Sequence, residues 1–138
     1  GLMWRVVAVW LMLAAPAWAA EIEARIDLSD QTMTVFVDGD AAYTWPVSTA
    51  RPGKFTPTGM FTVQSMRPMH YSTLYNNAPM PWSIFFWGNF AIHGTTQVDM
   101  LGRPASAGCV RLHPDDAKTL YQLIEEFGRG NTYIEIIE

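Results

Sequence analysis

The stretch that decides both fold and site runs from Ile92-His93-Gly94-Thr95 to Ser106-Ala107-Gly108-Cys109-Val110-Arg111-Leu112. His93 ends a predicted strand, and Cys109 begins an extended segment. Fifteen residues separate the two, which is enough for a hairpin-like return of the chain. The sequence therefore predicts that this histidine and this cysteine lie side by side.

A cysteine beside a histidine suits nucleophilic acyl chemistry. A thiol with a pKa of about 8.5 is mostly protonated at neutral pH, and a neighbouring imidazole can accept its proton. The thiolate then attacks a carbonyl group, and His93 returns the proton to the leaving amine. We expect the backbone around Gly108 and Cys109 to bind the oxyanion, because glycine allows close approach of a substrate. Only Asp99 is an acidic neighbour in sequence, so we expect a carbonyl such as that of Gly94 to orient His93.

Length and composition restrict the class of protein. The chain has 138 residues, which is room for one domain with a hydrophobic core. Its net charge of −4 argues against a general nucleic-acid-binding surface. A single cysteine excludes an internal disulfide and a multi-cysteine metal site, and we expect neither a metal nor another cofactor. By composition alone, the thiol is either a small buried apolar group or a reactive one.

The first nineteen residues resemble an export signal. Arg5 is followed by an apolar run from Val6 to Ala15, and Ala17-Trp18-Ala19 matches the pattern before a signal-peptidase cut. A buried N-terminal helix is the alternative. We expect residues 1–19 to be a signal peptide or export segment, which would be the only membrane contact, and 20–138 to be one domain.

The remaining pattern is mainly that of strands. Apolar and polar residues alternate with period two at the start of the chain, and Asp38-Gly39 is a typical hairpin turn. The predicted strands are 22–28, 33–37, 42–48, 59–64, 83–87, 90–93 and 132–137, with loops at 50–58 and 66–82. One helix is predicted over about 114–127, from an apolar stripe between Pro114 and Gly128. The pattern excludes a parallel Rossmann-type sheet.

The charges also point to a site. Residues 41–114 contain five Lys and Arg side chains, Arg103 and Arg111 among them, but only one acidic residue, Asp99. Such a locally basic region suits a carboxylate-bearing ligand, and ordinary solvated surface explains it equally well. The irregular stretch 66–82 is long enough to form a binding element or lid, and we place Tyr71 and Arg103 among the candidate substrate-binding residues.

The His-Gly-Thr segment at 93–95 and the Ser-x-Gly-Cys-Val-Arg-Leu segment at 106–112 resemble the signature of the L,D-transpeptidase (YkuD-like) catalytic domain. The segments 27–33 and 46–61 also resemble blocks of that family, so the likeness covers roughly 21–137. It implies a mixed β-sandwich or barrel-like fold with one C-terminal helix. One departure is Ala107, which stands where many members have a second histidine. By sequence position alone, neither His70 nor His113 replaces it, and we expect His113 to cap the helix or lie on the surface.

The resemblance also implies peptidoglycan chemistry outside the cytoplasm, in the periplasm or cell envelope. Cys109 would be acylated by a tetrapeptide stem with loss of D-Ala, and an amine of another stem would take the acyl group in a 3→3 cross-link. His93 would be the base and the Gly94 carbonyl its orienter. The remaining implied roles are an oxyanion site at Gly108 and Cys109, site or substrate contacts from Arg111, and turn support from Ser106.

Two rival functions remain open at this point. One is a hydrolase of the same fold, an L,D-carboxypeptidase or amidase that passes the acyl group to water. The other is a catalytically silent wall-binding domain that keeps the cleft without using the thiol. The expected partner is the peptidoglycan stem peptide, and we expect a monomer.

Overall fold

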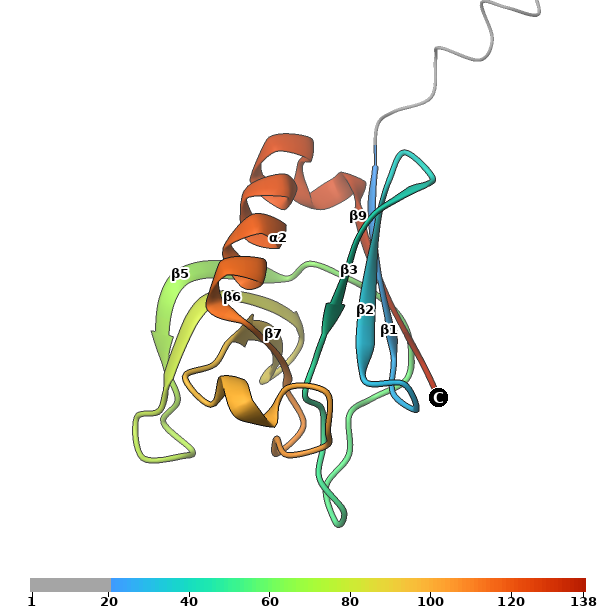
Figure 1. Cartoon of the computed structure of the whole chain (residues 1–138). Coiled ribbons are helices and arrows are strands. Elements are labelled where there is room, and N and C mark those ends of the chain that lie inside the picture. Colours follow the sequence, from blue (N-terminus) through green and yellow to red (C-terminus); the bar gives the residue numbers. More distant parts are fainter. Residues whose placement is uncertain (1–20) are drawn as a thin grey trace, which may run out of the picture.

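The structure is a computed structural model that describes residues 21–138. The predicted signal peptide at 1–19 therefore lies outside the described residues. Within 21–138, no helix is both long and apolar enough to cross a membrane. The described chain folds into two β-sheets and one long helix (Figure 1).

The first sheet has five strands in the order β3-β2-β1-β9-β4. Its members are β1 (Ile22–Asp27), β2 (Thr32–Val37), β3 (Asp40–Pro46), β4 (Gly59–Thr62) and β9 (Thr132–Ile137). β1 and β9 run parallel, and the other pairs are antiparallel. Along β1 the residues alternate between buried and less buried positions, as the period-two pattern predicts.

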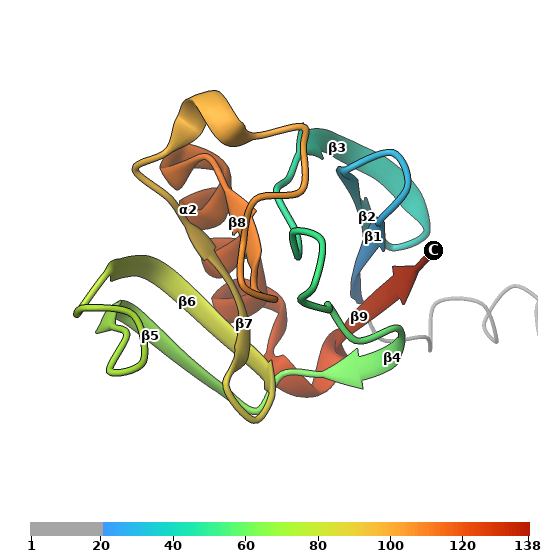
Figure 2. The same ribbon diagram turned by 90° about the horizontal axis from the view of Figure 1, so that it is seen from below.

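The second sheet has four strands in the order β5-β6-β7-β8 and carries the site. Its members are β5 (Ser65–Tyr71), β6 (Pro79–Trp87), β7 (Phe90–Gly94) and β8 (Val110–Leu112). Short 3₁₀ turns, η2 (Val98–Met100) and η3 (Arg129–Asn131), lie in the connections. Seen from below, the two sheets stand on either side of the molecule, with the segment after β3 running between them (Figure 2).

The helix α2 (Pro114–Phe127) joins the two sheets through the core. It begins after His113, whose side chain accepts a hydrogen bond from the Asp115 amide at 3.1 Å, so the expected capping role is confirmed. The buried stripe of α2 comprises Ala117, Leu120, Tyr121 and Ile124. It packs mainly on β6 and β7, and the same core cluster includes apolar residues of β1, β2 and β9.

The mainly β fold with one helix at 114–127 is confirmed, but two expectations were wrong. The predicted loop 66–82 is a loop only at 72–78, because β5 and the first half of β6 pair across it. Prolines in both strands obscured this pairing in the sequence: Pro68 lies in the edge strand β5, which tolerates a missing N–H. In addition, β7 and β8 run parallel, so the chain returns through η2 rather than through a hairpin.

A strap of five residues, 47–51, connects the two sheets and holds the segment that contains Cys109. Ser48 and Arg111 exchange two backbone hydrogen bonds, at 3.0 and 2.9 Å. The Thr49 carbonyl accepts from the amides of Ala105 and Ser106, and the Arg51 amide donates to the Ser106 carbonyl. The strap itself is fixed to the first sheet through a bond from the Val47 amide to the Gln31 carbonyl.

We predict that Gln31→Met destabilises the fold by about 3 kcal/mol, because the buried Gln31 amide makes three bonds that methionine cannot make. The side chain donates to Leu28 O and Thr49 Oγ1 and accepts from the Thr49 amide. The same change at the exposed Gln122 of α2 is the matched control. Chemical denaturation of both variants is the measurement, and equal stabilities would contradict the anchoring of the strap through Gln31.

Candidate active site

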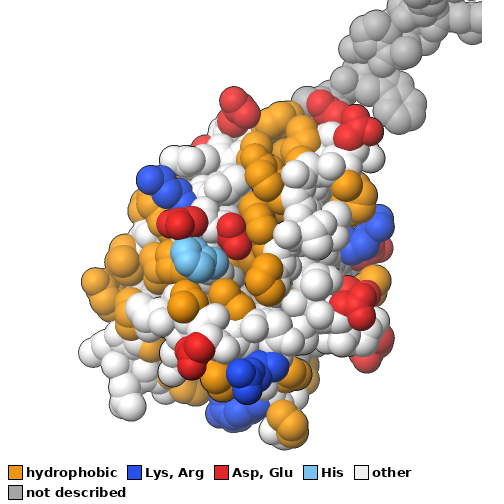
Figure 3. Space-filling view, viewed as in Figure 1, with side chains coloured by type: hydrophobic (Ala, Val, Ile, Leu, Met, Phe, Trp, Pro, Cys, Tyr) orange, Lys and Arg blue, Asp and Glu red, His pale blue; other side chains and the backbone are white. Residues whose placement is uncertain are grey.

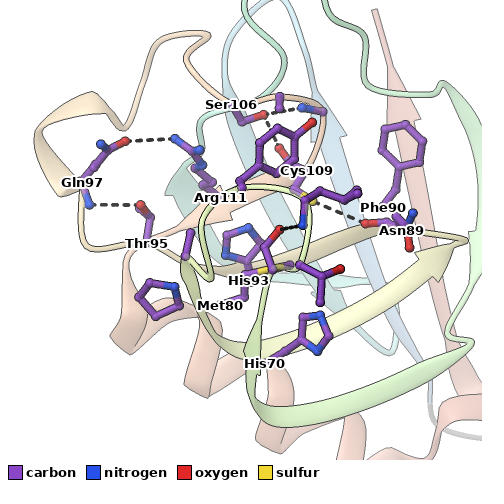
Figure 4. A pocket seen from close by; sticks show the side chains of 18 of the residues that line it. His70, Met80, Asn89, Phe90, His93, Thr95, Gln97, Ser106, Cys109 and Arg111 are labelled. Carbon is purple, nitrogen blue, oxygen red and sulfur yellow. Dashed lines mark hydrogen bonds between the residues drawn. The ribbon is translucent and has the colours of Figure 1, made fainter.

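A cavity of about 460 Å³ opens beside β7 and β8. Its walls come from the loop 72–78, the ends of β5 and β6, the residues after β7, the strap and the segment 106–111. Figure 4 shows the labelled side chains of His70, His93 and Cys109 directed into the space between these segments. The sequence-predicted pair of His93 and Cys109 therefore lines one cavity.

His93 is held as a neutral imidazole. Its ring is 6% exposed, and Nδ1 lies 2.7 Å from the Gly94 carbonyl oxygen. Because a carbonyl oxygen only accepts, Nδ1 carries the hydrogen and Nε2 is left with a free lone pair. Burial lowers the pKa of His93 to about 4, and the positive charge of Arg111 contributes in the same direction. At neutral pH the ring is ready to accept a proton rather than to donate one.

Gly94 fits a position where a side chain has no room. A Cβ atom there would lie 3.0 Å from Pro114 Cα and 3.1 Å from Pro81 Cγ. The backbone of β7 therefore approaches the start of α2 closely, and this contact fixes the Gly94 carbonyl against which His93 is oriented. The sequence indicated this carbonyl as the orienter, and the structure places it within hydrogen-bond distance of the ring.

Cys109 is partly buried in the cavity wall, directly before the first residue of β8. Its Sγ lies 3.7 Å from the Asn89 carbonyl, which can accept the thiol hydrogen. Burial raises the pKa of the thiol, while hydrogen bonding from the Ala91 backbone and the charge of Arg111 oppose this shift. The resting site is therefore a neutral thiol with a neutral imidazole, not a preformed ion pair.

Ser106 and Thr56 shape the turn before the cysteine. The buried Ser106 hydroxyl donates to the Cys109 carbonyl at 2.6 Å and accepts from the Gly108 amide at 3.0 Å. The Thr56 hydroxyl donates to the Gly108 carbonyl at 2.8 Å and accepts from the Ala50 amide. This set of bonds closes the turn on itself and ties it to the strap, which agrees with the support expected from Ser106.

Gly108 is required by both conformation and space. Its φ of +141° lies in a region that side chains rarely adopt, and a Cβ would come within 2.7 Å of Phe90 Cε1. Its amide, however, already donates to Ser106, so the role predicted for it in an oxyanion site would require that bond to break. The Cys109 amide makes no hydrogen bond within the described residues and is free to serve.

Two arginines give the cavity a positive charge. Arg111 is half-buried, donates to Gln97 Oε1 at 3.1 Å, and lies near enough to Arg51 for the two charges to interact. Burial lowers the pKa of Arg111, but a guanidinium remains charged at neutral pH. No Asp or Glu of the described chain lines the cavity. The locally basic region expected from the sequence thus includes residues that face one pocket.

The charges on the surface of the molecule agree with the positive charge of the cavity. On the face shown in Figure 3, the largest group of Lys and Arg side chains lies at the lower end, where Figure 1 shows η2 and the loop after β3. Acidic side chains are spread over the rest of that face. A carboxylate ligand would therefore meet a positive field on approaching this end of the molecule.

Two of the predicted binding residues lie outside the cavity. Arg103 is exposed on the loop after η2, where its carbonyl accepts from Ser48 Oγ, and its side chain is not part of the cavity wall. Tyr71 is 55% exposed at the end of β5, and successive residues of a strand face opposite sides, so its neighbour His70 lines the cavity instead. The substrate-binding role predicted for Arg103 and Tyr71 stays a prediction, and neither side chain forms part of the cavity wall.

Sequence reasoning missed several residues of the site. Arg51 was noted only as part of the basic stretch, His70 only as a loop residue, and Gln97 and Thr56 not at all as site residues. Of these residues, only His70 could have been found from the sequence. It is adjacent to Tyr71 in a segment that forms strand β5, and adjacent residues of a strand face opposite sides. Ala107 lines the cavity and brings no titratable group to it.

Fold and site together define a small β protein with a cysteine and a neutral histidine in one basic cavity. Residues 22–133 match the profile of the YkuD L,D-transpeptidase catalytic domain. The chain belongs to this family.

Relatives and solved structures agree with this assignment. The YkuD protein of Bacillus licheniformis is 22% identical over 103 residues, which cover 72% of this chain and 58% of that protein. The structure of an L,D-transpeptidase from Mycobacterium smegmatis matches with a TM-score of 0.77 and 25% identity, over 86% of this chain and 59% of the other. The LdtMt1 L,D-transpeptidase, solved in complex with imipenem, has a TM-score of 0.75 and 22% identity, with the same coverages. This chain thus spans less than two thirds of the length of these relatives.

We predict that Gly94→Ala lowers the rate of acyl-enzyme formation by at least about tenfold, because the added methyl group displaces the carbonyl that orients His93. Gly130→Ala is the control, since a Cβ there meets nothing within 4 Å. Thiol-specific acylation measured by mass spectrometry is the readout. An unchanged rate in a folded Gly94→Ala protein would contradict the orienting role.

The burial of His93 also predicts an effect of pH on stability. The pKa of His93 is about 4 in the folded state, below its ordinary value of 6.5, so the unfolded chain binds more protons between these values. The free energy of unfolding should therefore fall by about 3 kcal/mol as the pH drops from 6.5 to 4. His93→Gln should lack this loss, whereas His113→Asn, at the exposed helix cap, should keep it. Denaturation curves at several pH values test this; identical pH profiles for His93→Gln and wild type would contradict it.

Proposed function

We propose that this domain is a peptidoglycan L,D-transpeptidase in which Cys109 carries the acyl group. The observation that supports this most strongly is that a neutral thiol and a neutral, oriented imidazole line one open basic cavity. Membership of the family supports this class of chemistry, and the site contains the residue types that acyl transfer through a thioester needs.

In the first half-reaction, Nε2 of His93 takes the proton of Cys109, and Sγ attacks the carbonyl of the third residue of a tetrapeptide stem. The Cys109 amide is the available donor to the resulting oxyanion. When the tetrahedral species collapses, the C–N bond to the terminal D-Ala breaks, and His93 returns the proton to the leaving amine. A thioester and free D-Ala result.

The two arginines account for recognition of the donor. A tetrapeptide stem ends in the carboxylate of D-Ala, and guanidinium groups bind carboxylates through paired hydrogen bonds. Arg111 is pre-positioned by Gln97, and no carboxylate of the described chain competes for it in the cavity. We assign Arg111 and Arg51 to the carboxylate end of the donor.

In the second half-reaction, an amine of another stem attacks the thioester and the C–S bond breaks, which gives a 3→3 cross-link and restores the thiol. Such a substrate lies outside the cytoplasm, in keeping with the expected export of the chain to the periplasm or cell envelope. The stem peptide is the partner proposed here, and the domain acts as a monomer.

Imipenem tests the nucleophile, since LdtMt1 was solved in complex with this compound. Intact-mass measurement should show one adduct on the wild type, none on Cys109→Ala, and slower labelling of His93→Gln. Arg111→Gln should also be labelled more slowly, on the order of tenfold, through loss of a charge-assisted contact to the ligand carboxylate. Its matched control is Arg103→Gln, which should behave as wild type because Arg103 lies outside the cavity. A wild-type protein without an adduct would favour a silent wall-binding domain.

Product analysis separates the transferase from a hydrolase. Incubation with tetrapeptide stems should yield 3→3 dimers when the acyl group passes to an amine and tripeptides when it passes to water. We expect dimers. Tripeptides as the main product would contradict transfer and support the same-fold carboxypeptidase.

A further inference from the structure

His70 is a second imidazole in the cavity, and the reaction as described leaves it unused. It lies near the end of the edge strand β5, in register with Met80 of β6, and both residues line the cavity. Its ring stands edge-on to the Phe85 ring, with centroids 5.1 Å apart. The strand and this aromatic contact hold the ring toward the site rather than toward bulk solvent.

The surroundings of His70 are suited to proton transfer. Within the described residues its ring makes no hydrogen bond, in contrast to His93, whose Nδ1 is occupied by Gly94. The His70 and His93 rings line the same cavity (Figure 4). The titratable and charged groups around the cavity are Arg51, Arg111, Cys109, His93 and Tyr75.

The two histidines occupy different parts of the site. In Figure 4 His93 lies between the labelled Arg111 above it and His70 below it. A positively charged substrate would be repelled by the two arginines and would enter from the side of His70, where Met80 and Phe85 form a neutral wall. The cavity thus has a basic side at Arg111 and a side at His70, where the labelled neighbour Met80 is uncharged (Figure 4).

Transfer to an amine needs a second base. An alkylamine is an ammonium ion at neutral pH, and its nitrogen becomes nucleophilic only after it loses a proton. In the acyl-enzyme Nε2 of His93 is unoccupied, but the acceptor must lose two protons in all, and His93 holds only one at a time and is a weak base because it is buried. His70, a partly buried imidazole that lines the same cavity as Cys109, is available to take the proton of an incoming ammonium ion.

We propose that His70 is the catalytic base that deprotonates the acceptor ammonium group, which makes the β5 side of the cavity the acceptor side. This inference rests on the proposed transpeptidase function. The ammonium ion transfers one proton to a free ring nitrogen of His70. The amine then attacks the thioester carbonyl and the C–S bond breaks. One of the two remaining amine protons passes through His93 to Sγ, the other stays on the amide nitrogen, and His70 releases its proton to water.

The experiment compares two acceptors on the same acyl-enzyme. Wild type and His70→Gln react with a tetrapeptide donor in the presence of either a diaminopimelate-containing stem, whose amine is charged, or hydroxylamine, which is largely uncharged at neutral pH. His70→Gln should lose transfer to the stem amine on the order of 100-fold. Transfer to hydroxylamine should fall far less, because hydroxylamine does not need to be deprotonated before attack.

Two further readouts separate catalysis from structure. The deficit of His70→Gln should shrink as the pH rises, since the acceptor then loses its proton in solution. Added imidazole should restore part of the activity of His70→Ala. His113→Gln is the matched control, because that histidine lies outside the cavity wall and its loss should leave transfer unaffected.

Equal losses with both acceptors, or a deficit that does not depend on pH, would overturn the assignment and leave His70 a structural residue. The imipenem adduct distinguishes failure of the proposed function from failure of this inference. A wild type that forms no adduct refutes both. A labelled wild type with equal losses for both acceptors refutes only the role of His70.

Discussion

The hydrogen bonds between the strap 47–51 and the segment 102–111 are the constraint on which the site depends. Cys109 lies in a segment with little regular structure, of which only the last two residues, Val110 and Arg111, belong to β8. This segment is fixed against β7 by the paired hydrogen bonds between Ser48 and Arg111 and by the hydrogen bonds at Thr49. Since Gln31 anchors the strap to the first sheet, the nucleophile is positioned by both sheets although it contacts only one.

The second feature on which the site depends is that His93 and Cys109 are both uncharged before a substrate binds. Burial disfavours the charged forms of both side chains, so the pKa of His93 falls and that of Cys109 rises. A neutral thiol is less readily oxidised than a thiolate, which would protect Cys109 at the location outside the cytoplasm that we propose for the chain. The proton is transferred when a substrate carbonyl arrives, and the nearby Arg111 favours the thiolate that forms.

Much of the fold could be predicted from the sequence because its signals were local. Period-two alternation indicated β1 and β2, and the apolar stripe with Pro114 indicated α2. The pairing of β5 with β6 could not be found this way, because their prolines resemble loop residues and only the register across the sheet reveals the pairing. The motif around Cys109 could be identified because its signal is also local. The places of Arg51 and His70 in the cavity wall, and that of Arg103 outside it, depend on contacts between distant segments.

The central claim is that His93 is neutral, with its hydrogen on Nδ1 and Nε2 free for the thiol. The most direct test is the nitrogen-15 NMR spectrum of the histidine side chains at neutral pH, with His93 assigned by comparison with His93→Gln. The account predicts a protonated Nδ1 and an unprotonated Nε2 for His93 in the resting protein. An imidazolium ion, or the tautomer with its hydrogen on Nε2, would contradict it.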